Sequence, residues 1–318
     1  MFTKLMTTAV VGAATAMLSF GAVAAGYPEK PITVVIPFGP GGSHDLNARV
    51  FTSVMPAHVG QPMVVQLTPG ASGQKGAAAV AKAKADGYTL LFSSNYIDQL
   101  MQHVGKAPYN SMEDFVTVAR INYAPIAVIV PGDSPYNSWA DLKKDVKARP
   151  GKVSISHSGN WGALFVPAAQ LMLLNDMKMN MIPFQGGGPA LQALLGGIVD
   201  VSLGFPSTIG PLILSGEIKV LATAGKKPIY KDVPSFADLG LEGDVGMMHR
   251  MVMAPKGIPA DRLATLRAAF KALQGDKTFT RLLKRMGENA EYMDGPEYEK
   301  LRPGQNKFYG ELVKSLTK

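Results

Sequence analysis

The chain alternates between short apolar runs and amphipathic stretches, beginning at Pro31. Residues 32–38 (ITVVIPF) are apolar and rich in β-branched side chains, which is typical of a strand buried on both faces. After the break GPGGS, apolar residues recur every four positions over residues 45–55, as on one face of a helix. Further strands are indicated at 63–67 and within 85–94. The alternation predicts a mostly parallel sheet covered by helices, an α/β fold.

A second region with the same alternation begins near residue 126. One of its helices is expected to start at Pro189, with glycines at its end, which is the usual asymmetry of helix termini. Three predominantly helical stretches follow Pro259. The strands expected in this second region lie at 126–130, 152–158, 199–205 and 218–224.

Two extended runs, residues 120–130 and 247–254, lie between the two regions. We interpret them as two crossings between lobes, which would make a hinge suited to closure on a ligand. One lobe would then be residues 27–125 with 251–318, and the other residues 126–250. The alternative is two domains that follow one another along the chain, and the sequence hardly distinguishes the two arrangements.

Composition narrows the class of protein. The 318 residues are 47% hydrophobic and 18% charged, which is a globular rather than a disordered composition. Cysteine is absent, so disulfides, thiolate metal sites and cysteine nucleophiles are excluded. The net charge is +8, but basic residues are interleaved with acidic ones and lack aromatic neighbours. We therefore expect no nucleic-acid partner, whereas the basic balance suits an anionic small molecule.

The pattern of the N-terminal residues is typical of an export signal peptide. Lys4 precedes an apolar stretch over residues 5–20, and Ala22-Val23-Ala24 fits a small-x-small cleavage pattern. The predicted signal peptide is residues 1–25, and its removal would leave a protein of the bacterial periplasm. A transmembrane anchor is the alternative, although the apolar run is short for a membrane span.

A Gly-rich loop at a strand-to-helix junction is the strongest chemical signal. In residues 37–45 (PFGPGGSHD), glycines let the backbone approach a ligand, and the N–H groups of the first helical turn form an anion site. Ser43 or Asp45 is expected to cap that helix. For one such loop alone, an ordinary Gly-Pro turn is the alternative. Similar loops, however, follow other strands, and the carboxyl ends of strands are where open α/β sheets bind ligands. These loops are residues 68–76, 156–162 and 184–190.

Catalytic, nucleotide and metal motifs are missing. GPGGSH has His44 in place of the third glycine of G-x-G-x-x-G, and no phosphate-binding P-loop or G-x-S-x-G elbow occurs. We therefore expect no cofactor and no metal, although the lack of motifs does not eliminate an enzyme. The five histidines, none at a metal-ligand spacing, are His44, His58, His103, His157 and His249.

Four segments together resemble the substrate-binding proteins of tripartite tricarboxylate transporters, the TctC or Bug family. The resemblance implies a periplasmic receptor with two α/β lobes and a hinge, the Venus-flytrap arrangement. It also implies a small organic carboxylate as ligand, membrane permease subunits as partners, and a monomer without enzyme activity. A sensing module or a periplasmic enzyme acting on an acid stays open. The segments are residues 27–49, 68–91, 183–201 and 251–263.

The resemblance also implies which residues hold the ligand. In this family a carboxylate is held between the lobes, largely by main-chain amides and ordered waters, and Asp45 is expected to organise its loop rather than to react. The residues carried over are Gly41, Gly42, Ser43, Asp45, Gly70, Ala71, Ser72, Gly73, Ser158, Gly159, Asn160, Gly186 and Gly187. Phe38, Ser94 and Trp161 complete the predicted ligand-binding set.

The chain departs from the family pattern at several positions. Leu67-Thr68 replaces a usual Asn-Arg pair, and His44 stands where a small residue is common. Trp161 would either stack on an aromatic acid or pack against the protein. His249 or Arg250 would either clamp a second carboxylate or face solvent. The identity of the acid is therefore left open, from dicarboxylic to aromatic and amino acids.

Overall fold

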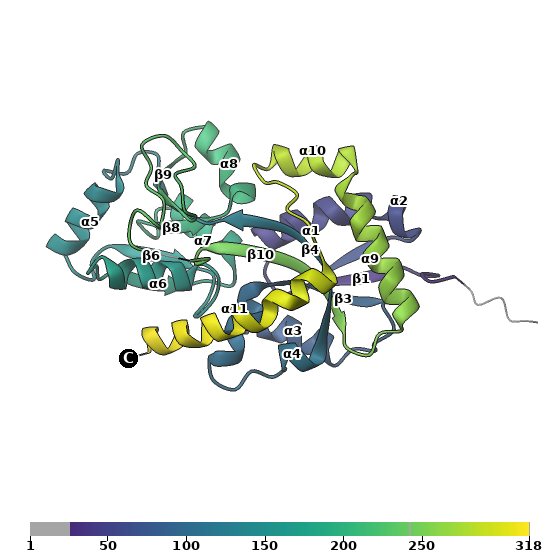
Figure 1. Cartoon of the computed structure of the whole chain (residues 1–318). Coiled ribbons are helices and arrows are strands. Elements are labelled where there is room, and N and C mark those ends of the chain that lie inside the picture. Colours follow the sequence, from purple (N-terminus) through teal and green to yellow (C-terminus); the bar gives the residue numbers. More distant parts are fainter. Residues whose placement is uncertain (1–25, 242, 318) are drawn as a thin grey trace, which may run out of the picture.

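The computed structural model describes residues 26–241 and 243–317 (Figure 1), so the predicted signal peptide lies outside the described residues. Strands and helices alternate along the chain, and the helices lie on the outside of two groups of strands. Within the described ranges, no helix combines the length and the apolar character that crossing a membrane requires.

The larger sheet has six strands in the order β11-β4-β10-β3-β1-β2. Strand β1 (Ile32–Ile36) pairs in parallel with β2 (Met63–Leu67) and with β3 (Thr89–Ser94). The other three strands run antiparallel to their neighbours, and they are β4 (Phe115–Pro125), β10 (Met247–Pro255) and β11 (Met293–Asp294).

Helices before and after the crossings cover this sheet. The long ones are α1 (Ser43–Val54), α3 (Gln74–Ala81), α9 (Ala260–Gln274), α10 (Lys277–Arg285) and α11 (Gly295–Leu316). The short ones are α2 (Pro56–Val59), η1 (Ala71–Gly73), η2 (Tyr96–Leu100), η3 (Met101–His103) and α4 (Ser111–Asp114).

The second group of strands forms two small sheets, β8-β5-β9 and β6-β7, joined by a parallel bridge between Ile155 and Val201. Its strands are β5 (Ala127–Pro131), β6 (Ser154–His157), β7 (Asn180–Pro183), β8 (Ser202–Gly204) and β9 (Ile218–Thr223). Its helices are α5 (Trp139–Ala148), α6 (Phe165–Leu174), α7 (Gly187–Leu195) and α8 (Pro206–Leu214).

The prediction of a mostly parallel sheet is wrong for half of the larger sheet and for the sheet β8-β5-β9, whose pairs are antiparallel. Strand β4 leads directly into β5, and β10 brings the chain back, so the two crossing strands run in opposite directions. They pair along their whole length, from Met247 opposite Pro125 to Pro255 opposite Phe115. Because β10 carries the chain back in the direction opposite to β4, the two strands pair antiparallel, and such a pair needs no crossover helix. The prediction of two extended crossings and of a two-lobed α/β fold is confirmed.

The core follows from these pairings. Beneath α1, the Phe51 ring meets Phe92 at 5.1 Å and Phe270 of α9 at 5.8 Å, which ties the sheet to its helices. A second group of buried side chains extends from the small sheets to Leu312 and Val313 at the end of α11. The C-terminal helix therefore packs against both lobes, and the lobe boundaries drawn from the sequence stay a prediction.

Candidate functional site

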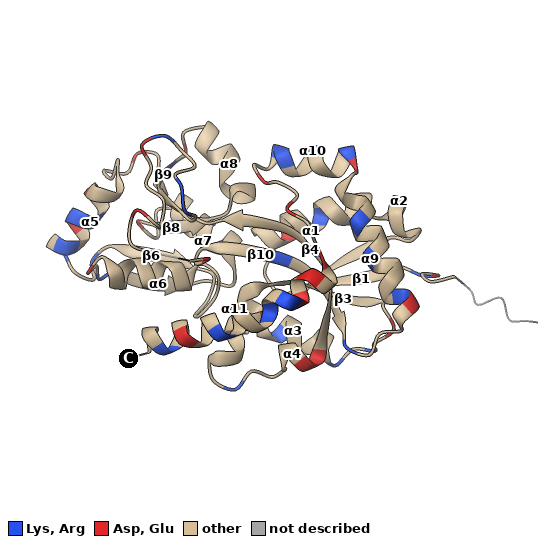
Figure 2. Cartoon of the chain, in the orientation of Figure 1, with Lys and Arg blue, Asp and Glu red and all other residues tan. Residues whose placement is uncertain are grey.

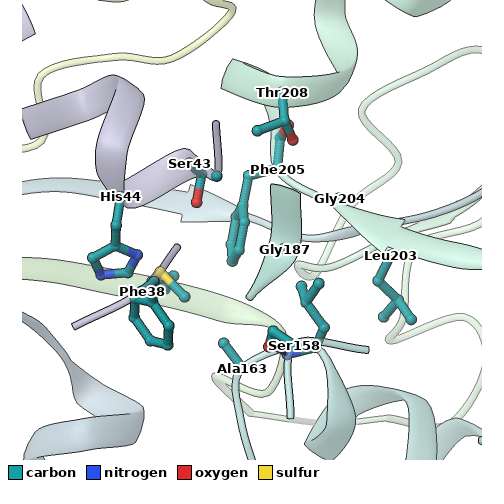
Figure 3. Close-up of a pocket in the computed structure, with 13 residues that line it drawn as sticks. Phe38, Ser43, His44, Ser158, Ala163, Gly187, Leu203, Gly204, Phe205 and Thr208 are labelled. Atoms are coloured by element: carbon teal, nitrogen blue, oxygen red, sulfur yellow. Dashed lines mark hydrogen bonds between the residues drawn. The ribbon is translucent and has the colours of Figure 1, made fainter. Parts of the chain in front are cut away.

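Two adjoining cavities lie where the loops of the two lobes meet. The first cavity has a volume of about 30 Å³, more than the roughly 10–15 Å³ that one water molecule needs. Figure 3 shows its lining side chains converging from both lobes. They are Phe38, Gly42, Ser43, His44, Ser158, Ala163, Leu164, Gly187, Leu203, Gly204, Phe205, Thr208 and Met248.

The second cavity is larger, about 300 Å³. It shares Phe38 and Ser158 with the first cavity, so the two form neighbouring compartments of one site. Its other lining residues are Pro37, Gly70, Ala71, Ser72, Gly73, Gly159, Asn160, Pro183, Phe184 and Gln185.

Helix α1 begins at the first cavity without a side-chain cap. Its N-cap is Gly42, so the prediction that Ser43 or Asp45 caps the helix is wrong. Asp45 turns back instead, and its Oδ2 accepts a hydrogen bond of 2.9 Å from the Gly41 amide. Its Oδ1 accepts one of 2.9 Å from Arg49 Nε. The Asp45 carboxylate therefore stabilises the loop. The first N–H groups of α1 have no partner within the helix and remain available to a group in the cavity.

Helix α7, from the other lobe, begins at the same place. Its N-cap Gly186 also supplies no side-chain hydrogen bond, and Gly187 lines the first cavity. A Cβ atom at Gly188 would lie 2.6 Å from the Pro40 oxygen and 2.9 Å from the Gly42 nitrogen. Only glycine permits this approach of two backbones. The result is a pair of helix N-termini, from opposite lobes, that face one cavity.

The loops around the second cavity also touch across the lobes. Ser72 Oγ lies 2.7 Å from the Asn160 carbonyl oxygen, and a Cβ atom at Gly159 would come within 2.6 Å of that hydroxyl. Ala71 and Ser72 both have positive φ, 47° and 53°, which is uncommon for residues with side chains. The lobes are therefore in contact, and the structure represents a closed arrangement.

No Lys, Arg, Asp or Glu is among the described residues that line either cavity. Figure 2 shows charged residues on outer helices such as α5, α10 and α11. Arg250 is fully buried outside the lining, where its Nη1 bonds Glu288 Oε2 at 2.7 Å. Its guanidinium lies 4.7 Å from the centre of the Phe205 ring. Recognition of an anion here would therefore depend on main-chain dipoles and neutral side chains.

The histidines near the site are buried. Burial, and then the charge of Arg250, hold the pKa of His44 well below its ordinary value, so the ring is neutral. Burial also lowers the pKa of His157, which does not line either cavity. His249 Nε2 lies 2.7 Å from Asp244 Oδ2, away from both cavities. Neither His249 nor Arg250 therefore reaches the cavities as a clamp in this structure.

The structure brings most of the predicted residues to the cavities but leaves five outside their linings. Ser94 is fully buried at the end of β3, and the Trp161 ring packs 5.4 Å from Phe165. The five residues outside both linings are Gly41, Asp45, Ser94, Trp161 and Gly186. The sequence prediction missed apolar wall residues such as Leu203, Phe205 and Met248, which carry no motif that could have identified them.

Fold and site together define a two-lobed binding protein, and comparison with known proteins gives the family. The model of the tripartite tricarboxylate transporter family receptor, TctC, matches residues 47–317, and the chain belongs to this family. The resemblance drawn from the sequence is thereby confirmed. Protein BugT of Bordetella pertussis is 34% identical over 259 residues, which are 80% of this chain and 79% of BugT.

Solved structures of similar proteins match the fold of this chain over nearly its whole length. Rpa4515 of R. palustris, solved with adipate, is 25% identical with a TM-score of 0.85 and covers 92% of this chain and 99% of its own. MatC of Rhodopseudomonas palustris, solved with bound malate, is 26% identical with a TM-score of 0.84 and covers 90% of this chain and 100% of its own. The family consists of periplasmic solute-binding receptors.

Proposed function

We propose that this protein is an exported periplasmic receptor that captures a small organic carboxylate between its lobes and delivers it to membrane permease subunits. One observation carries the proposal. The uncapped N-termini of α1 and α7 come from opposite lobes and meet at a cavity whose described lining contains no charged side chain. The relatives solved with adipate and malate support a carboxylate as the class of ligand.

Helix N-termini suit this task. Each carries unpaired N–H groups and about half a positive elementary charge from the aligned peptide dipoles. Two helix N-termini that bind the same carboxylate both attract its negative charge, and no lysine or arginine side chain is needed in the site. An acidic side chain among them would repel the ligand, and Asp45 avoids this because its oxygens already bond Gly41 and Arg49.

Capture follows from the two-lobed geometry. A ligand that contacts only one lobe binds open and closed forms alike, whereas one held by α1 and α7 together favours the closed form. Ligand therefore shifts the population toward closure. The crossing strands β4 and β10 are paired along their length, so they would bend together and restrict the motion to a hinge. This is binding and release, and it requires no covalent step.

The test is a thermal-shift panel of mono-, di-, tri- and aromatic carboxylic acids on the purified protein lacking residues 1–25. An acid at 100 times its dissociation constant should stabilise the folded state by about 2.7 kcal/mol. The methyl esters and amides of the same acids, which lack the negative charge, serve as controls and should give no shift. Equal binding of the neutral controls, or conversion of a bound acid followed by NMR, would contradict the proposal.

A further inference from the structure

A buried carboxylate, that of Glu288, lies between the two lobes. The residue follows α10, is 3% exposed and lines neither of the two cavities of the site. Its Oε1 accepts a hydrogen bond of 3.2 Å from the Ser207 amide, at the start of α8 in the second lobe. Its Oε2 accepts one of 2.7 Å from Arg250 Nη1 on the crossing strand β10. Burying a carboxylate costs free energy unless its oxygens are well paired, and here the pairing joins the lobes.

The backbone of Glu288 is fixed to the first lobe. Phe279 and Leu283 of α10 belong to the core beneath α1. Gly287, with a φ of 74°, follows the end of α10, and the Glu288 amide donates a hydrogen bond of 3.0 Å to the Leu283 carbonyl oxygen. This is the Schellman arrangement of a helix C-terminus. Glu288 is therefore presented by a well-defined helix end and moves with the first lobe.

The start of α8 receives its cap from the other lobe. Its N-cap residue Phe205 supplies no side-chain hydrogen bond, and Pro206 follows as the first helical residue. Proline has no N–H group, so Ser207 carries the first one of the helix. A carboxylate is a favoured partner at the positive end of a helix dipole. Glu288 thus caps, from the first lobe, a helix of the second lobe.

Two buried asparagines support this contact. Asn122 of β4 donates from its Nδ2 to Glu288 Oε2 and, at 2.8 Å, to Asn47 Oδ1. Asn47 of α1 donates in turn from its Nδ2 to the Ser207 hydroxyl, at 3.4 Å. Ser207 therefore meets the first lobe both through its amide and through its hydroxyl.

The contact lies on the same side of the crossing strands as the first cavity. Side chains two positions apart on a strand point to the same face, so Arg250 shares a face of β10 with Met248, which lines that cavity. The Phe205 ring, also in the lining (Figure 3), lies 4.7 Å from the Arg250 guanidinium. A hinge motion that opens the cavity would therefore also draw Ser207 away from Glu288.

We propose that Glu288 is a positioning residue for lobe closure: its carboxylate caps α8 only in the closed form, and it thereby raises ligand affinity without touching the ligand. A contact made in one form alone shifts the population toward that form. This inference rests on the proposed function, since it assigns a residue that holds the lobes around the same ligand. Arg250 Nε and Nη2 have no partner within the described residues, so the ion pair with Glu288 is needed in both forms.

The decisive variant keeps the charge and shortens the side chain. Glu288→Asp, one methylene shorter, cannot reach Arg250 and Ser207 together. Stopped flow and calorimetry with malate, adipate and benzoate as probes give the rates and the affinity. For the acid that binds most tightly, the dissociation constant should rise roughly 3–10-fold, as the loss of one net hydrogen bond predicts, and mainly through faster dissociation. Glu291→Asp, the same change at an exposed position, should match wild type.

Variants at Ser207 test the contact from the second lobe. Ser207→Pro removes the amide hydrogen that Glu288 accepts, in the first helical turn, where proline is tolerated. It leaves the ion pair of Glu288 with Arg250 in place. Ser207→Ala keeps the amide and loses only the hydroxyl, so it should retain most of the affinity that Ser207→Pro loses. This pair of variants decides the matter even where Glu288→Asp does not fold.

Distances between the lobes distinguish a loss of closure from a local defect in the site. The chain has no cysteine, so two introduced thiols can carry spin labels without competition. Lys144→Cys on α5 and Ala272→Cys on α9 are exposed positions on different lobes. With saturating acid, pulsed electron resonance should show a larger long-distance population in Glu288→Asp and Ser207→Pro than in wild type.

Three results would contradict this role of Glu288. Wild-type affinity in both Glu288→Asp and Ser207→Pro would do so, and so would weaker binding with an unchanged distance distribution. In either case the proposed function stands. If no acid binds the wild-type protein, the proposed function fails, and the ligand-free distances alone decide on Glu288. Identical ligand-free distributions in wild type and both variants would then exclude a role in closure, whereas longer distances in the variants would support it.

Discussion

Ser72 Oγ donates a hydrogen bond of 2.7 Å to the carbonyl oxygen of Asn160, 88 residues further along the chain. The bond joins the loop after β2 to the loop after β6, and it therefore links the two lobes directly. It depends on an unusual backbone, because Ser72 has a φ of 53° between Gly70 at 137° and Gly73 at 98°. These glycines allow the turn that lifts the hydroxyl toward the opposite lobe.

Ser72→Ala should therefore weaken ligand binding by destabilising the closed form. One neutral hydrogen bond contributes about 0.5–1.5 kcal/mol, so affinity for an acid identified in the panel should fall up to roughly tenfold. Small-angle X-ray scattering should show a larger radius of gyration at the same ligand concentration. Ser53→Ala is the matched control, since its hydroxyl bonds only the Val50 carbonyl at 2.8 Å within α1. Identical affinities of the two variants would show that the bond does not stabilise closure.

Much of this architecture is predictable from local patterns. The apolar run over residues 32–38 and the glycines after it place β1, the turn and α1 correctly, because each depends on neighbours in sequence. The two extended crossings are predictable for the same reason. What the pattern does not reveal is that they pair with each other, since residues more than 120 positions apart form that ladder, such as Met247 and Pro125.

The walls of the site are harder to predict than its loops. Phe205 and Met248 are ordinary core residues in type, and only the closure of the lobes brings them beside His44. The wrong prediction of the helix cap has a different, local reason. Asp45 is a favoured N-cap residue, but at the third helical position it reaches back to the Gly41 amide and leaves Gly42 as the cap. From the sequence alone, Arg250 was a candidate to bind a second carboxylate of the ligand. In the fold it forms an ion pair with Glu288 instead.

Gly42→Ala tests the meeting of the two helix N-termini. Gly42 has φ −79° and ψ 166°, which any residue adopts, so the substitution adds no backbone strain. Its new methyl group would lie 3.3 Å from the Gly188 nitrogen and 3.9 Å from the Gly187 nitrogen. We expect at least a roughly tenfold loss of carboxylate affinity by calorimetry, equal to about 1.4 kcal/mol.

Gly304→Ala provides the control for that substitution. Gly304 lies within α11, and nothing is within 4 Å of the Cβ position. Alanine in a helix interior should raise the free energy of unfolding by about 0.5–1 kcal/mol and leave affinity unchanged. If Gly42→Ala binds as tightly as Gly304→Ala, the amides of α1 and α7 do not hold the ligand.

Asp45→Ala should loosen the first loop. Asp45 is buried, and the substitution removes both its bond to the Gly41 amide and its bond to Arg49. Bonds to a charged group contribute about 1.5–3 kcal/mol, and urea unfolding should show a loss within that range. Arg49→Ala separates the two bonds. The Arg49 side chain is 59% exposed, so its ion pair should contribute no more than about 1 kcal/mol. Equal losses in the two variants would assign the effect to the ion pair rather than to the loop.

Stability at acid pH should depend on Glu299, where α11 docks on β4. Its Oε1 accepts a hydrogen bond of 2.7 Å from the Thr117 amide, and Arg302 Nη1 lies 2.9 Å from its Oε2. Burial alone would raise the pKa of Glu299, but the Thr117 hydrogen bond and the Arg302 charge outweigh it and hold that pKa below its ordinary value of 4.5. The folded state thus binds the Glu299 proton less tightly than the unfolded state does.

The sign of the pH effect follows from linkage. The free energy of unfolding contributed by Glu299 is present above its unfolded pKa of 4.5 and is lost as the pH falls through the lower folded value. Glu299→Gln should therefore lower the urea midpoint at pH 7, and the difference from wild type should shrink steadily between pH 4.5 and pH 3. Glu311→Gln, at an exposed position of the same helix, should follow the wild-type curve. A Glu299→Gln curve parallel to wild type across that range would mean that the carboxylate does not couple the docking of α11 to pH.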